Sequence, residues 1–227
     1  MKQTDIINPF QPYMTLEMDG YSQINRTDYG ISHFYEFTIH DEKKHCIKAV
    51  PDASIDLLFN IGENKVSTYI SGTVFGVKKW ELGTQDDCFG VRFQPGQGIL
   101  PKDITMEMIV NDDIEIDGDI FGKNLTEKIA LAKTMSERID IFKKAYEDIV
   151  LGRSSLSDKE KINEYLVNRI SRTKGMITMR QLEDETNYSA CYLRRIFKSF
   201  HGISPKQFAQ YISCLLYTSP SPRDISG

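Results

Sequence analysis

The chain has 227 residues, of which 40% are hydrophobic and 26% charged, and its net charge is −4. This composition is ordinary for a soluble globular protein whose length allows one or two domains, each with a buried core. The sequence contains no apolar run of eighteen residues, no signal-peptide pattern and no paired cysteine spacing. We therefore expect a cytoplasmic protein without a membrane partner.

Short segments rich in β-branched and aromatic residues fill the first hundred positions, and turn-forming residues separate them. We expect strands at residues 35–39, 47–50, 55–61, 66–70 and 88–93. The turns fall at residues 51–52, 62–64, 85–87 and 95–96. Closely spaced short strands of this kind predict a β-barrel or a β-sandwich.

Two helical segments follow at residues 125–133 and 136–150. The second carries an apolar stripe made of Ile139, Phe142, Ala145, Tyr146 and Ile149. This stripe fits packing against the strands and a homodimer contact equally well. Residues 151–155 have the composition of a linker.

The next helix begins at a capping box of Ser157 and Glu160, and its apolar face predicts a buried side. The residues expected on that side are Ile162, Tyr165, Leu166 and Ile170.

Residues 176–211 predict two short helices, a tight turn and the start of a third helix. Thr178 and Gln181 form a capping box for the first of these helices. Asn187 suits the turn because asparagine tolerates positive φ. Ser189 can cap the second helix, and Gly202 lies just past its end. This is the spacing of a helix-turn-helix.

The helix at residues 189–201, hereafter the recognition helix, has two distinct faces. Leu193, Ile196, Phe197 and Phe200 recur at i, i+3, i+4 and i+7, and so do Cys191, Arg194, Arg195 and Lys198 on the opposite side. A helix held by its apolar face and presenting cations to solvent is suited to a major groove. An ordinary amphipathic surface helix is the alternative.

The charge distribution agrees with this interpretation. Residues 1–156 contain 17 Lys and Arg against 25 Asp and Glu, whereas residues 157–213 contain 10 against 6. Such an asymmetry is expected when only one part of a chain meets nucleic acid.

The helix-turn-helix resembles the DNA-binding region of the AraC family of bacterial transcription regulators. The matching residues are Leu182, Ser189, Leu193, Arg195, Phe197, Lys198, Gly202, Ile203, Ser204, Pro205 and residues 208–211. In that family, two helix-turn-helix units joined by a long helix occupy successive major-groove turns. The resemblance implies double-stranded DNA as the partner.

Residue roles follow from the same resemblance. Base-edge contacts are implied for Cys191, Arg194 and Arg195, and phosphate contacts for Arg180 and Lys198. Ser189 and Ala190, at the start of the recognition helix, complete the expected DNA-binding surface. Two positions depart from the family pattern, which has a small Ala where this chain has Glu183 and Gly where it has Asn187. We expect Glu183 either to strain the helix packing or to face water.

A second resemblance covers roughly residues 10–120, which look like the cupin-like N-terminal domain of one AraC-family branch. The residues that carry it are Pro51, Asp52, Ala53, Gly72 and the segments 56–59 and 90–96. It implies a sensing or dimerising domain that responds to a small-molecule effector.

Enzymatic alternatives have less support in the sequence. A cupin-type enzyme needs metal ligands, but the chain has only four histidines, and His40 and His45 flank a charged turn. No motif for a phosphate loop or a nucleophile is present. A DNA-repair module with a similar helix-turn-helix would need an activated cysteine, and Cys191 lacks such a setting. We expect no catalytic residue, no metal and no cofactor.

The last fourteen residues resemble a translated sequencing adapter, and Pro220 and Pro222 would end a helix. We therefore expect the helix to stop near Ile212, the second helix-turn-helix to be missing, and DNA binding by this chain to be weak.

The sequence thus predicts an α+β protein that regulates transcription and is not an enzyme. The expected parts are a cupin-like domain at residues 1–122, a helical segment and linker at 123–156, a partial DNA-binding domain at 157–213 and a non-native tail at 214–227.

Overall fold

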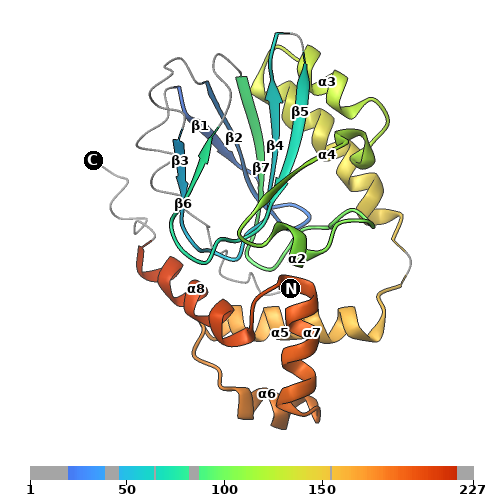
Figure 1. Ribbon diagram of the computed structural model, residues 1–227. Helices are drawn as coiled ribbons and strands as arrows, with labels where there is room; N and C mark the ends of the chain where they lie inside the picture. The colour runs from blue at the N-terminus through green and yellow to red at the C-terminus, as the bar shows by residue number, and fades with distance from the viewer. Residues whose placement is uncertain (1–19, 39–45, 64, 82–86, 154, 219–227) are drawn as a thin grey trace. The chain divides into compact units, whose positions relative to one another are not determined.

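The computed structural model describes residues 20–38, 46–63, 65–81, 87–153 and 155–218. These residues form two compact units that divide between Ser155 and Leu156. The first unit combines strands and helices, and the second consists of helices (Figure 1). The expected α+β class is confirmed.

Antiparallel strands build the sheets of the first unit. The described strands are β1 (Ser22–Asn25), β2 (Ile31–Thr38), β3 (Cys46–Ala49), β4 (Asp56–Ile61), β5 (Val66–Ser71), β6 (Lys78–Glu81), β7 (Asp87–Phe93) and β8 (Asp113–Ile116). Among them, six strands pair in the order β1-β2-β7-β4-β5-β8, and β3 pairs with β6 in a separate sheet (Figure 1).

The strands β2, β3, β4, β5 and β7 correspond to the five that the sequence predicts. The strands β1, β6 and β8 were not predicted, because each has only four residues, and the sequences SQIN and KKWE of β1 and β6 are mostly polar. Of the expected turns, residues 64, 85 and 86 lie outside the described residues.

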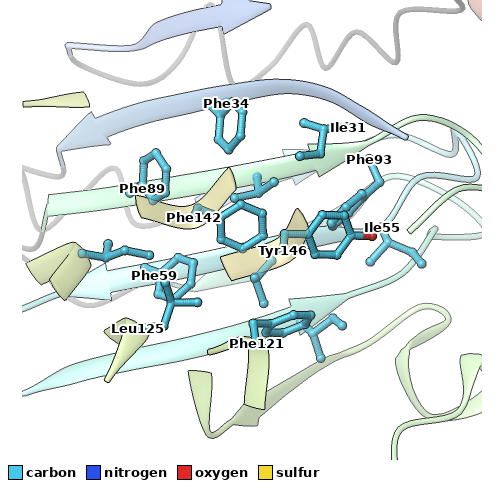
Figure 2. Packing of buried hydrophobic residues seen from close by; sticks show 14 of the residues in the cluster. Ile31, Phe34, Ile55, Phe59, Phe89, Phe93, Phe121, Leu125, Phe142 and Tyr146 are labelled. Atoms are coloured by element: carbon cyan, nitrogen blue, oxygen red, sulfur yellow. The ribbon is translucent and has the colours of Figure 1, made fainter. Parts of the chain in front are cut away.

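Helices cover one face of the six-stranded sheet. They are α3 (Leu125–Leu131) and α4 (Met135–Leu151), preceded by the short helices α2 (Met106–Ile109) and η2 (Gly118–Phe121). Figure 2 shows Phe142 and Tyr146 of α4 lying against aromatic side chains of the sheet. The ring centroids of Phe142 and Phe34 are 6.0 Å apart, and those of Tyr146 and Phe93 are 5.3 Å apart. The apolar stripe of α4 therefore packs on the sheet, which was one of its two expected roles.

The second unit consists of α5 (Asp158–Arg172), α6 (Met179–Thr186), α7 (Ala190–His201) and α8 (Pro205–Thr218) within the described residues. Leu166, Val167 and Ile170 of α5 are buried, and the predicted capping box of Ser157 and Glu160 is present. The prediction that Tyr165 is buried was wrong, since this side chain is 38% exposed.

The helix α8 continues beyond the point where we expected it to end. It runs to Thr218, and Leu215 on it is buried. The predicted stop near Ile212 was wrong because the proline residues lie further along the chain, and Leu215 extends the buried face of Phe208 and Ile212. Residues 219–227 lie outside the described residues, so the origin of the tail stays a prediction.

Candidate nucleic-acid interface

The turn between α6 and α7 has the predicted geometry. Asn187 follows α6 with φ of 57°, in the left-handed region, and its N–H donates to the carbonyl of Glu183 at 2.8 Å. Thr178 and Gln181 form the predicted capping box at the start of α6. The capping box therefore begins α6, and the left-handed Asn187 ends it, so that the chain enters α7 within three residues.

The helix α7 is fixed at both ends and along one side. The hydroxyl of Ser189 accepts from the N–H of Tyr192 at 3.4 Å, and Gly202 ends the helix with φ of 66°. Leu193, Ile196 and Phe197 are buried, whereas Phe200 is only half-buried. Three apolar anchors therefore hold α7, rather than the four predicted.

The opposite side of α7 faces solvent. The predicted DNA-binding residues that are exposed are Arg180, Ser189, Cys191, Arg194, Arg195 and Lys198. Ala190 is half-buried. All but Arg180 belong to α7 or its N-cap, and Arg180 lies in the first turn of α6. The structure thus leaves a cationic strip of side chains accessible along α7.

Aromatic contacts orient Arg195, and no sequence pattern predicted them. Its guanidinium carbon lies 5.4 Å from the ring centroid of Tyr192. The Tyr192 ring in turn lies 5.1 Å from that of Tyr188, in the turn. A cation over an aromatic face gains about 0.5–1 kcal/mol at an exposed site. Tyr192 therefore restricts the positions that Arg195 adopts.

Arg194 has a different environment from Arg195. It borders a hollow of about 710 Å³ that is otherwise lined mainly by apolar side chains of α5, α6 and α8. Lys206, in the first turn of α8, borders the same hollow, as does Thr178 at the start of α6. The two arginines of α7 therefore lie in distinct surroundings although they are adjacent in sequence.

Glu183 has a role that neither sequence expectation anticipated. Its side-chain Oε1 accepts a hydrogen bond from the backbone N–H of Ala190 at 2.6 Å. This N–H is the first in α7 and has no acceptor inside the helix. Glu183 therefore caps the recognition helix from α6, and it neither disturbs the packing nor simply faces water.

A polar network attaches α6 to α5. The carboxylate of Glu185 accepts from the hydroxyl of Tyr165 and from the Nε of Arg169, both at 2.7 Å. These hydrogen bonds lower the pKa of Glu185 to about 2, with the bond from Arg169 as the largest cause. Because all three side chains are partly exposed, we expect the network to orient α6 more than it stabilises the unit.

His201, near the end of α7, lies in the core of the second unit. Its ring contacts those of Phe197 and Phe208, with centroids 4.3 Å and 5.9 Å away. Its Nε2 and the Oδ1 of Asn163 are 2.8 Å apart. Burial lowers the pKa of His201 to about 3. The imidazole of His201 is therefore neutral near pH 7 in the folded protein, and the core holds no charge at this position.

The first unit contains a buried ionic cluster formed by Arg92, Asp52 and Asp56. Arg92 makes ion pairs with both carboxylates, and the hydroxyl of Tyr35 donates to Asp56 at 3.2 Å. Burial raises the pKa of Asp56, and Arg92 partly offsets that rise. Asp52, Asp56 and the segment that contains Arg92 all belong to the residues that carry the cupin-like resemblance, and the structure brings them together in this cluster.

The cluster depends on glycine at position 90. A Cβ atom there would lie 2.0 Å from the Cζ of Tyr35, because the Tyr35 ring covers this part of β7.

The Nε of Arg92 is buried and has no hydrogen-bond partner among the described residues. One donor of this cluster is therefore available to a further acceptor.

Metal ligands do not converge in the described part of the chain, where no three His, Cys, Asp or Glu side chains form a group that could hold an ion. The ring Nδ1 of His33 lies 3.0 Å from the hydroxyl of Ser32, and burial lowers its pKa to about 3. His40 and His45, the histidines considered for the enzymatic alternative, lie outside the described residues.

Comparison with known proteins adds one match. A family model described as a domain of unknown function, DUF6597, matches residues 29–115. This range includes Asp52, Asp56 and Arg92. No curated protein and no solved structure gives a significant match. Among the residues that the structure describes, no helix is both long enough and apolar enough to cross a bilayer.

Proposed function

We propose that this protein is a sequence-specific transcription regulator of the AraC type, which binds double-stranded DNA through α7. In this proposal Cys191, Arg194 and Arg195 contact base edges in the major groove. Arg180 and Lys198 contact phosphates. Ser189 and Ala190 bring the start of the helix close to the duplex.

One observation carries the proposal: α7 buries Leu193, Ile196 and Phe197 and exposes Arg194, Arg195 and Lys198. A capped helix anchored in this way can enter a groove without losing its packing. Arginine side chains suit the task because they bind O6 and N7 of guanine together. The matched DUF6597 domain also occurs in AraC-family regulators, which supports the same class.

The first unit would then hold the effector. The Nε–H of Arg92, which has no hydrogen-bond partner among the described residues, favours a ligand with a hydrogen-bond acceptor. We also propose a homodimer. Ile139, Phe142 and Tyr146 of α4 pack against the sheet, so a dimer contact would use another surface.

Selection of duplexes from a random-sequence library by the purified protein tests this function, and it is done at low salt so that the weak binding expected of this chain is detected. We expect a shared sequence to emerge, and Arg195→Ala to weaken binding to it by roughly 5-fold to 150-fold, the equivalent of about 1–3 kcal/mol per bidentate base contact. Binding to unrelated duplexes should change much less, because Arg195 is proposed to read bases.

Arg172→Ala provides the matched control, since Arg172 is an exposed arginine at the end of α5 and outside the helix-turn-helix. This variant should bind the selected duplex almost as the unaltered protein does. If no sequence is enriched, or if both variants lose affinity equally, the proposed function is incorrect.

A further inference from the structure

The first turn of α7 carries two side-chain caps, and one of them is charged. Ser189 accepts from the N–H of Tyr192, and Glu183 accepts from the N–H of Ala190. Serine is the usual kind of cap. The carboxylate of Glu183 is unusual because it comes from the preceding helix, α6, and places a full negative charge at the start of α7.

The start of a helix is normally attractive to anions. Its unpaired N–H groups and the helix dipole together favour a carboxylate or a phosphate there. Glu183 satisfies the first of these N–H groups at 2.6 Å, so a phosphate would have to displace it. A phosphate passing nearby would also be repelled by its charge.

This carboxylate lies next to the proposed DNA-binding surface. Ala190, to which it is bonded, stands between Ser189 and Cys191, and both of these neighbours are exposed. At an ionic strength of about 0.1 M, charges act over roughly 10 Å, so only groups close to the duplex change its binding strongly. If α7 enters the groove, Glu183 lies close enough to the duplex to act on its phosphates.

We propose that Glu183 is a specificity-determining residue that weakens the attraction of α7 for the phosphate backbone. Binding then depends more on the base contacts of Arg194 and Arg195. The inference rests on the proposed DNA-binding function and adds a role that the family resemblance does not provide, since the family has Ala at this position. The physical reason is that backbone affinity is blind to sequence, whereas base contacts are not.

The variant Glu183→Gln separates charge from capping. Its amide oxygen can still accept from Ala190, so circular dichroism should show the helices intact. We expect affinity for a random-sequence duplex to rise roughly threefold to tenfold near 0.1 M salt. The slope of log K against log salt should become steeper by up to about one unit, the effect of one charge. Fluorescence anisotropy of a labelled duplex measures both quantities.

Asp184→Asn is the matched control. Asp184 is the next residue of α6, is exposed, and shows no bond to α7 among the described interactions. The Asp184→Asn variant removes the same charge as Glu183→Gln, but we expect it to change the affinity and the slope of log K against log salt less. Equal effects of the two variants would indicate a general influence of net charge and would overturn the inference.

The inference is also overturned if Glu183→Gln leaves affinity and salt slope unchanged while the unaltered protein binds its selected duplex. A different result contradicts the proposed function instead: the unaltered protein enriches no sequence from the library and binds no random-sequence duplex at low salt. The two failures are therefore distinguishable in one set of titrations.

Discussion

At the scale of single residues, several side chains act through partners far away in the sequence. Glu183 caps α7 from α6, and Tyr35 occupies the space that the absent side chain of Gly90 leaves free. Both were invisible in the sequence, because a tertiary hydrogen bond or a ring lying over a glycine has no local pattern. The caps at Thr178 and Ser189 were predictable because their partners lie three residues away.

Gly90→Ala tests how strictly the ionic cluster depends on this packing. The added methyl group would overlap the Tyr35 ring, and overpacking of a core costs about 1–3 kcal/mol of unfolding free energy. Urea unfolding should reveal the loss. Gly76→Ala is the control, because a Cβ there meets no atom within 4 Å. A Gly90→Ala protein as stable as the Gly76→Ala protein would refute the proposed packing.

At the scale of elements, the strongest periodic patterns predicted the structure well. Most members of the apolar stripes of α4 and α7 are buried, and five strands lie where alternating or β-branched segments predicted them. Ala145, Ile149 and Phe200 of these stripes are half-buried. The strands β1 and β8 escaped prediction because they form the edges of the sheet. An edge strand packs few side chains, so its sequence need not be apolar.

The burial of His201 makes the second unit sensitive to acid. The folded pKa of about 3 lies below the ordinary value of 6.5, so the unfolded chain binds a proton that the folded one excludes. Stability is therefore fully present above pH 6.5 and is lost as the pH falls toward 3. Between pH 7.5 and pH 5 we expect a loss of about 2 kcal/mol from this residue.

The variant His201→Gln isolates this contribution, because glutamine keeps a donor for Asn163 but does not titrate in this range. Chemical denaturation at both pH values should show a smaller pH effect for the variant. His33 has a depressed pKa as well, but it is present in both proteins and so cancels in the comparison. Identical pH effects would contradict the role given to His201.

At the scale of the whole molecule, the sequence predicted an α+β chain whose basic part is helical, and the structure agrees on the class. It did not predict that α8 extends to Thr218, because the buried position of Leu215 depends on the packing of the entire second unit. The ionic cluster of Arg92 was likewise hidden, since its members lie 36 and 40 residues apart. Helix caps, turns and single strands or helices could be predicted from the sequence, because their residues are close together in the chain. The ionic cluster and the buried position of Leu215 could not, because they depend on tertiary packing.

The central claim is that the exposed side of α7 is the DNA-binding surface. Backbone amide shifts recorded by NMR, as a selected duplex is added to the protein, test it most directly. We expect the largest shift changes at Cys191, Arg194, Arg195 and Lys198, and smaller ones at Arg180. Changes confined to the first unit, or no changes along α7 at saturating DNA, would contradict it.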